Sequence, residues 1–247
     1  MLNRSITPVY RNPHTLVKIH RMNRLTGRLA DTMIQAMIFD LDGVLIDSER
    51  TWDEVRRAVV AAHGGQWKPE ATRVMQGMST PEWARYLVED LGAALTPDRI
   101  ATTVIDEMAE RYAAGPPVLP GAEATVRAVA ARYPVAIASS SPPVLIAAFL
   151  DATGLTELVP VAVSSEQVGA GKPAPDVYLA AARHLGVPAE ACAAVEDTTN
   201  GLRAALAAGM TVYAMPNPHF PPDPDVLARV DVVLTEIADL PGRLPAA

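Results

Sequence analysis

The sequence is poor in cysteine and in positive charge. Cys192 is the only cysteine among 247 residues, so no disulfide can form within the chain, which suits a reducing compartment. Because no activating neighbour is evident, we interpret Cys192 as a small core residue near Val195 rather than as a nucleophile. The formal net charge of -7 argues against nucleic acid or an anionic membrane as the main partner.

Long apolar runs are missing too. No uninterrupted apolar stretch reaches the roughly 18 residues of a membrane-spanning helix, and the N-terminus has charges and prolines where a secretory signal would have an apolar core. We therefore expect a cytoplasmic protein with neither a membrane nor a nucleic acid as its partner. The residues that are abundant, 49% apolar and 20% charged, are typical of a globular chain.

The first 33 residues differ in charge from the rest. They contain six Lys/Arg and one acid, whereas the remaining residues contain 15 Lys/Arg and 27 acids. Three interpretations compete for this basic extension: a disordered tail, a transit-like peptide, or an upstream extension from a misplaced start codon, with Met33 or Met37 as the real start. We favour the tail or the misplaced start, because a transit peptide requires an organellar host.

From residue 35 onward, the order of the expected elements predicts an α/β fold. The apolar run 36–39 indicates a buried strand. Helical spacing follows near 51–63, 81–92 and 97–113, where Thr80-Pro81 and Thr96-Pro97 provide a capping hydroxyl and a first-turn proline. Strands and helices then alternate: strands are expected near 134–138, 159–163, 192–196, 211–214 and 231–234, and helices near 121–132, 142–151, 175–185, 199–208 and 236–240.

This alternation predicts a doubly wound, Rossmann-like parallel sheet with helices on both faces. An all-helical insert interrupts the sheet after its first strand. We divide the chain into the basic extension 1–33, an α/β core formed by 34–48 and 116–247, and a helical insert of residues 49–115. In such a sheet, ligands bind beyond the carboxyl ends of the strands, so the polar residues at those ends are the candidates for function.

The first strand ends in two carboxylates, Asp40 and Asp42, in Asp40-Leu41-Asp42-Gly43. Two acids directly after an apolar strand are costly to bury without a cation or another partner. One interpretation is a solvated turn rich in acidic turn formers. The other is a cation site that leaves one carboxylate free for nucleophilic or acid–base chemistry.

Three further strand ends carry polar residues. Ser139, Ser140 and Ser141 precede Pro142 and form either a phosphate cradle or an ordinary helix cap. Lys172, between Gly171 and Pro173, either neutralises a phosphate together with a carboxylate or is a solvated loop lysine. Another acid pair, Glu196-Asp197, follows an apolar strand. Taken together, these four strand ends predict a site for a divalent cation and a phosphate.

Four segments of this chain, in this order, resemble the four motifs of the haloacid dehalogenase superfamily. They are Asp40-Leu41-Asp42-Gly43, the serine after 135–138, Gly171-Lys172-Pro173 and Glu196-Asp197. The resemblance covers residues 35–240. The insert directly after the first motif resembles the helical cap of the subfamily that contains beta-phosphoglucomutase and sugar-phosphate phosphatases.

The resemblance implies a role for each motif residue. Asp40 attacks phosphorus and forms an aspartyl-phosphate, while Asp42 protonates the leaving oxygen and then deprotonates the hydrolytic water. Ser139 hydrogen-bonds the phosphoryl group together with the Ser140 amide. Lys172 holds Asp40 and the phosphate oxygens.

The resemblance also implies a bound Mg²⁺ with oxygen ligands. The expected ligands are Asp40, the Asp42 carbonyl and Asp197, with Glu196 close by or ligating. The second aspartate, Asp42, favours phosphoryl chemistry, because dehalogenases of the superfamily need no leaving-group acid and lack this residue.

Residues of the insert distinguish between a phosphatase and a mutase as the predicted function. Where the mutase has a histidine and an arginine that orient a bisphosphate, this chain has Trp52 and Thr80. The segments around Trp52 and Ser139–Ser141 resemble bacterial phosphatases of 2-deoxyglucose 6-phosphate and hexitol phosphates. We therefore expect a phosphatase of a small sugar or polyol phosphate, and keep a beta-phosphoglucomutase-type mutase and a catalytically silent phosphate-binding protein as alternatives.

The substrate-binding residues of the insert rest on analogy. Trp52 either stacks on a sugar face or is an aromatic of the insert's own core. Gln76 and Gly77 lie on the turn that faces the substrate in the related caps. We expect the protein to act as a monomer or weak homodimer.

Overall fold

The computed structural model describes residues 33–75, 78–218 and 221–245, and residues from Ile34 onward form one compact unit. The basic extension 1–33, apart from Met33, lies outside the described residues, and so do Gln76 and Gly77. Among the helices of the described ranges, none combines the length and the apolar character needed to cross a membrane.

The core is a six-stranded sheet in which every pair of neighbouring strands is parallel. Its spatial order is β3-β2-β1-β4-β5-β6. The strands are β1 (Ala36–Phe39), β2 (Val135–Ser139), β3 (Val161–Ser164), β4 (Cys192–Glu196), β5 (Thr211–Ala214) and β6 (Val232–Val233). The chain winds outward from β1 to β3 on one side and from β4 to β6 on the other, so the predicted doubly wound sheet is confirmed. The order reverses beside β1, where such sheets bind ligands.

The strands are buried on both faces because their side chains alternate between two hydrophobic clusters. In β1, Met37 and Phe39 pack into one cluster, and Ala36 and Ile38 pack into the other. Cys192 lies in the second cluster and is fully buried, which confirms its interpretation as a core residue.

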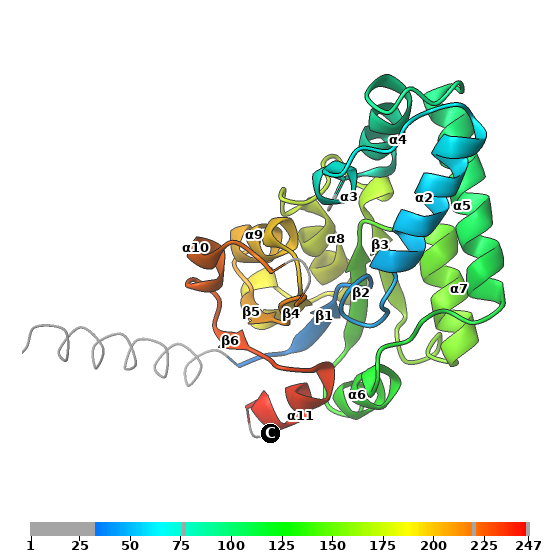
Figure 1. Cartoon of the computed structure of the whole chain (residues 1–247). Helices are drawn as coiled ribbons and strands as arrows, with labels where there is room; N and C mark the ends of the chain where they lie inside the picture. Colours follow the sequence, from blue (N-terminus) through cyan, green and yellow to red (C-terminus); the bar gives the residue numbers. More distant parts are fainter. Residues whose placement is uncertain (1–32, 76–77, 219–220, 246–247) are drawn as a thin grey trace, which may run out of the picture. The chain divides into compact units, whose positions relative to one another are not determined.

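Helices cover both faces of the sheet (Figure 1). Helices α6 (Ala122–Ala130), α7 (Pro143–Thr153) and α11 (Leu240–Arg243) contribute to the first cluster, and α8 (Asp176–Leu185), α9 (Thr199–Ala207) and α10 (Pro224–Leu227) contribute to the second. Alanines dominate the second cluster, and their small side chains allow α8 and α9 to pack close to the sheet.

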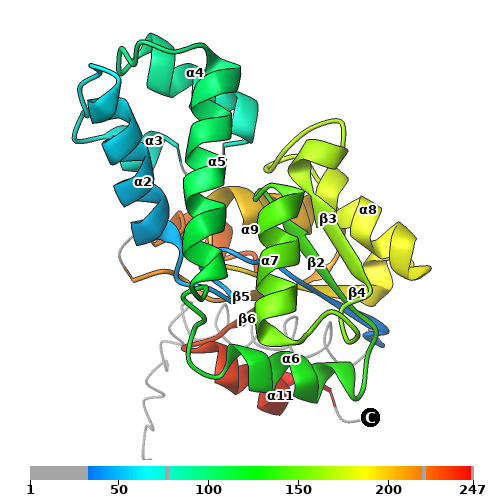
Figure 2. The same ribbon diagram turned by 90° about the vertical axis from the view of Figure 1, so that its right-hand side faces the viewer.

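The predicted all-helical insert after the first strand is confirmed. It consists of α2 (Glu49–Ala62), α3 (Ala71–Val74), α4 (Thr80–Glu89) and α5 (Pro97–Ala113). Helix α5 packs against both α2 and α4 and also contacts α7 of the core, as Figure 2 shows. The apolar faces of these helices, including Val55, Leu87 and Val104, are buried between them.

Three expectations about the helices were wrong or incomplete. The predicted cap Thr80 is the first residue of α4, and its N-cap is Ser79, whose amide and hydroxyl both donate to Glu82. The helix expected over 236–240 is a 3-10 turn followed by α11. The four-residue helices α3 and α10 were not predicted, because one turn is too short to show helical periodicity.

Candidate active site

The register of the sheet brings residues from three strands to one edge. Asp40 follows Phe39, which pairs with Ile137 on β2 and with Val195 on β4. The next residues of those strands, Ala138 and Glu196, therefore lie level with Asp40.

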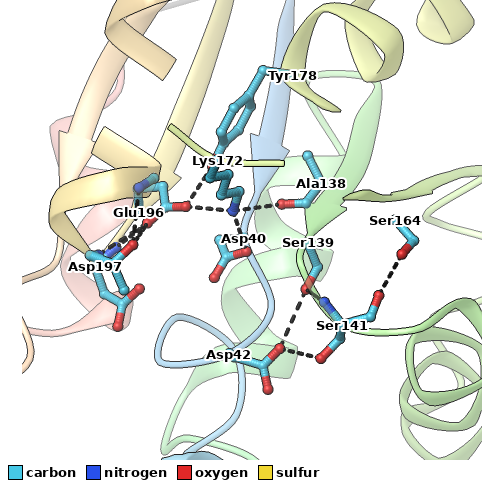
Figure 3. Close-up of polar contacts among 12 residues, drawn as sticks. Asp40, Asp42, Ala138, Ser139, Ser141, Ser164, Lys172, Tyr178, Glu196 and Asp197 are labelled. Atoms are coloured by element: carbon cyan, nitrogen blue, oxygen red, sulfur yellow. Dashed lines mark hydrogen bonds and ion pairs between the residues drawn. The ribbon is translucent and has the colours of Figure 1, made fainter. Parts of the chain in front are cut away.

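A single amine joins these three strand ends (Figure 3). The Nζ of Lys172 donates to Asp40 Oδ1 at 2.6 Å, to Glu196 Oε1 at 2.5 Å and to the Ala138 carbonyl at 3.1 Å. Lys172 is buried on the loop between β3 and α8. The structure therefore brings together the predicted pair Asp40 and Lys172, and it rules out a solvated loop lysine.

Glu196 accepts hydrogen bonds at both of its carboxylate oxygens. Besides Lys172, Oε1 accepts the Tyr178 hydroxyl at 3.0 Å. Oε2 accepts the amides of Asp197 and Thr198 at 2.9 and 3.1 Å and the Thr198 hydroxyl at 3.2 Å. The loop after β4 is thus tied to this buried side chain. Tyr178 and Thr198 were missed by the sequence analysis, and for Tyr178 no local pattern could have shown the contact.

Two glycines make room for the acid pair at the end of β4. A Cβ on Gly201 would lie 1.7 Å from Glu196 Oε1, and a Cβ on Gly43 would lie 2.0 Å from Asp197 Oδ2. Gly43 also has a φ of 82°, a backbone conformation that side-chain-bearing residues rarely adopt. Gly43 therefore allows the first motif to lie directly against Asp197.

Three buried carboxylates fit a divalent cation. Asp40, Glu196 and Asp197 each offer an oxygen, and these oxygens lie within 4.8 Å of one another. Among the described residues, the buried Oδ1 of Asp197 has no hydrogen-bond partner, which is costly unless a cation binds it. An all-oxygen donor set suits a hard ion such as Mg²⁺. The Asp42 carboxylate is outside this cluster, so any contribution of Asp42 is limited to the main-chain carbonyl expected from the family.

Burial raises the pKa values of two acids in this cluster. Burial, assisted by Glu196 and Asp42, raises the pKa of Asp40 to about 8, although Lys172 acts in the opposite direction. Burial also raises the pKa of Asp197 well above its usual value. For Lys172, burial alone would lower the pKa, but Asp40 and Glu196 outweigh it and keep the amine protonated. One ammonium thus faces three carboxyl groups, and all three can be ionised together only if a further positive charge, such as a metal cation, joins them.

Asp42 belongs to a second hydrogen-bonded group, which contains hydroxyls (Figure 3). Its Oδ2 accepts from Ser141 Oγ at 2.6 Å and from Ser139 Oγ at 3.3 Å. Its Oδ1 accepts from Ser48 Oγ and from the indole Nε1 of Trp52 at 3.2 Å. Ser141 was predictable as part of the serine run, whereas Ser48 carried no signal. The two motif aspartates therefore have different surroundings: an ammonium beside Asp40 and neutral donors around Asp42.

A cavity lies between the sheet edge and the insert. The core side is lined by residues that include Asp40, Asp42, Ser139, Ser140, Lys172 and Glu196, and the insert side by Glu49, Trp52, Asp53, Arg56, Thr72, Met75, Met78 and Trp83. Both interpretations of Trp52 have support, because its buried ring packs in the insert core and also lines the cavity. Gln76 and Gly77 lie outside the described residues, but the flanking Met75 and Met78 line the cavity. Arg56 was missed, although its four-residue spacing from Trp52 on α2 places both on one helix face.

Comparisons with known proteins agree with this geometry. The family description "haloacid dehalogenase-like hydrolase" matches residues 34–209. Hexitol phosphatase B of Escherichia coli is 33% identical over 217 residues, covering 85% of this chain and 96% of that protein. A probable pseudouridine-5'-phosphatase of Drosophila melanogaster is 30% identical over 211 residues, covering 82% and 89%.

Among solved structures, CbbY from Rhodobacter sphaeroides in complex with phosphate is similar to this chain, with a TM-score of 0.75 and 29% identity. The match covers 84% of this chain and 96% of that one. The family match spans most of the described residues and includes β1, β2 and β4, which carry the site. This chain therefore belongs to the haloacid dehalogenase-like hydrolases.

Proposed function

We propose that this hydrolase is a Mg²⁺-dependent phosphatase of a small sugar or polyol phosphate, and that Asp40 is its nucleophile. The observation that carries the proposal is the pairing of Asp40 with the buried ammonium of Lys172, while a second aspartate, Asp42, lines the same cavity. Similar proteins with hexitol and pseudouridine phosphatase names support the substrate class.

In the first step, a carboxylate oxygen of Asp40 forms a bond to phosphorus, and the bond from phosphorus to the leaving oxygen breaks. Asp42 gives a proton to that oxygen. In the second step, Asp42 takes a proton from water, the water oxygen attacks phosphorus, and phosphate leaves Asp40. Asp42 carries this proton before the first step, and the four neutral donors around it orient its carboxyl group for both transfers.

Lys172 neutralises Asp40 and the incoming phosphoryl oxygens, and Ser139 with the Ser140 amide binds the phosphoryl group. Asp40, Asp197 and the Asp42 carbonyl would hold Mg²⁺. Glu196, whose oxygens already accept five hydrogen bonds, would lie close to the ion. When bound, the ion supplies positive charge that stabilises the transferring phosphoryl group.

We further propose that the insert, residues 49–115, acts as the cap over this site. Trp52 forms part of the wall that contacts the substrate, and Gln76 and Gly77 are proposed substrate contacts by analogy with related caps. We expect a cytoplasmic protein. We also expect a monomer or weak homodimer, and gel filtration tests this oligomeric state.

The mutase remains the second candidate. Its bisphosphate-orienting arginine would take the position of Thr80, but Thr80 is buried in α4 and is not among the residues that line the cavity. Trp52, at the position of the histidine, is hydrogen-bonded to Asp42. Incubation with beta-glucose 1-phosphate and a bisphosphate activator tests this candidate: glucose 6-phosphate formed faster than free phosphate would favour the mutase.

Hydrolysis of p-nitrophenyl phosphate, with and without Mg²⁺, tests the proposed function. We expect activity that requires the metal and that Asp40→Asn abolishes. Activity that survives Asp40→Asn, or that persists in a chelator, contradicts the mechanism. Phosphate binding without turnover of any phosphomonoester would favour the catalytically silent binding protein.

A further inference from the structure

Arg56 lies in the wall of the cavity that belongs to the insert. It is one helical turn beyond Trp52 on α2, and its guanidinium carbon lies 4.6 Å from the centre of the Trp52 ring and 4.8 Å from the centre of the Trp83 ring. The two rings are 6.2 Å apart and tilted by 60°. Contacts with two aromatic faces hold a guanidinium in one place.

Arg56 has acidic neighbours but no direct ion-pair partner among the described residues. Within the same part of the chain, its buried Nε has no hydrogen-bond partner. The nearby Asp53 is already bound by Arg57 Nε at 2.5 Å and by the Thr72 hydroxyl.

Asp42 also acts on Arg56 electrostatically but accepts hydrogen bonds from four other donors. Burial lowers the pKa of Arg56 to about 10, although Asp42 and Asp53 act in the opposite direction. The side chain therefore stays charged at neutral pH. Asp42 and Asp53 are near but form no ion pair with Arg56, and a partly buried cation without a direct partner is stabilised by an anion that joins it from outside the chain.

We propose that Arg56 binds a second anionic group of the substrate, so that the preferred substrate is a phosphomonoester that also carries a carboxylate or a second phosphate. This inference rests on the proposed phosphatase function and adds a second anionic group to the substrate on which that site acts. Lys172 and the serines bind the phosphoryl group that is transferred, and Arg56 binds the other anion across the cavity. A neutral polyol phosphate would leave Arg56 unpaired.

Guanidinium chemistry and the surrounding wall support this assignment. A guanidinium matches a carboxylate or phosphate with two parallel N–H···O bonds, which an alcohol cannot provide. Met75, Met78 and Trp83 line the same cavity as Arg56, and apolar surroundings strengthen a charge-assisted hydrogen bond by excluding water. A bond of this kind corresponds to roughly a 10- to 100-fold difference in kcat/KM.

Two substrate pairs that differ by one anionic group test the inference. The first is glycerol 3-phosphate and 3-phosphoglycerate, and the second is fructose 6-phosphate and fructose 1,6-bisphosphate. The measured quantity is the ratio of kcat/KM for the second member to that for the first. We expect a ratio of roughly 10 or more in at least one pair for the wild type. A high ratio in the first pair identifies a carboxylate as the second anionic group of the substrate, and a high ratio in the second pair identifies a phosphate.

Variants on α2 connect this preference to Arg56. We expect Arg56→Gln to lower the ratio roughly 10- to 100-fold, mainly through KM, and Arg56→Lys to lower it less because the charge remains. Arg50→Gln is the matched control, because it removes an exposed arginine of the same helix that pairs with Glu54 outside the cavity. Its ratio should equal that of the wild type.

Two results would overturn the inference: ratios near one for both pairs in the wild type, or an unchanged ratio in Arg56→Gln. If Arg56→Gln does not fold, the inference is tested by the wild-type ratios together with the ratios measured for Arg56→Lys. Calorimetric binding of the same four compounds to Asp40→Asn separates the two proposals. Selective binding of the compounds that carry a second anionic group, without wild-type turnover, contradicts the phosphatase and supports the role of Arg56. Turnover without selectivity contradicts only the role of Arg56.

Discussion

The two walls of the cavity differ in how their charges are compensated. On the core wall, the Lys172 ammonium is shared by Asp40 and Glu196, and the hydrogen bonds run between strand ends of one sheet. On the insert wall, the Arg56 guanidinium lies over two tryptophan rings and forms no ion pair among the described residues. On the core wall, three clustered carboxyl groups outnumber one cation, whereas the insert wall has a cation that forms no ion pair with a described residue.

This difference separates chemistry from selectivity. A core wall that needs a cation suits a metal and a transferring phosphoryl group, whatever the rest of the substrate is. An insert wall with one fixed cation suits recognition of a particular substituent. Changes to the core wall should therefore affect turnover of every substrate, whereas changes to the insert wall should affect some substrates more than others.

The largest effect is expected for Asp40→Asn, which removes the nucleophile. The amide keeps the shape of the side chain, so the protein should fold, and kcat should fall at least ~10³-fold for every substrate. Because the substitution also removes one of three clustered buried carboxylates, its melting temperature without metal should equal or exceed that of the wild type. A variant that keeps a tenth of the wild-type kcat would show that Asp40 is not the nucleophile.

A smaller loss is expected for Gly43→Ala. The added methyl group would lie 2.0 Å from Asp197 Oδ2 and must displace that carboxylate. We expect a roughly 10- to 100-fold loss of Mg²⁺ affinity, measured from the metal dependence of turnover.

Gly64→Ala is the matched control for this variant, because Gly64 has a similar φ of 75° but no atom within 4 Å of the added methyl. Both alanines carry the same backbone strain, and only Gly43→Ala should weaken metal binding. Equal metal affinities in the two variants would contradict the placement of Asp197 at the metal.

Trp52→Phe tests the point where the two walls meet. The phenyl ring retains most of the aromatic contact with Arg56, but the 3.2 Å hydrogen bond from Nε1 to Asp42 is lost. Since Asp42 keeps three hydroxyl donors, we expect kcat to fall only about 3- to 10-fold, with a smaller change in KM.

Trp67→Phe is the control for this variant, because Trp67 stacks on Arg57 and is not among the residues that line the cavity. A kcat for Trp52→Phe that matches this control would mean that the indole hydrogen bond does not assist Asp42.

The smallest effect is a pH dependence of stability in the metal-free protein. The folded-state pKa of Asp40, about 8, is higher than its value of ~3.9 in an unfolded chain. The folded state therefore binds more protons between these values, and stability present at low pH is lost as pH rises through this window. We expect the melting temperature to fall by at least roughly 3 °C between about pH 5 and pH 8, and saturating Mg²⁺ to remove this fall. A metal-free melting temperature that rises over this range would contradict the raised pKa.

Much of the core wall could be predicted from the sequence. An apolar run followed by polar residues marks a strand end, and parallel strands bring their ends to one edge, so Asp40, Lys172 and Glu196 were expected together. The contact of Tyr178 with Glu196 was not expected, because it depends on how α8 packs across the sheet. The short helices α3 and α10 were also missed, since one turn has no detectable period.

The insert wall shows what tertiary structure alone decided. The sequence by itself determined the doubly wound fold, the helical insert and the strand ends that carry the chemistry. Hydrophobic periodicity and the succession of strands and helices along the chain can both be read directly from the sequence. Only the packed structure placed Trp52 against Asp42 and Arg56 between Trp52 and Trp83, since these contacts depend on how α2 and α4 meet each other and the sheet edge. That Arg56 forms no ion pair with a described residue could be recognised only once its neighbours were in place.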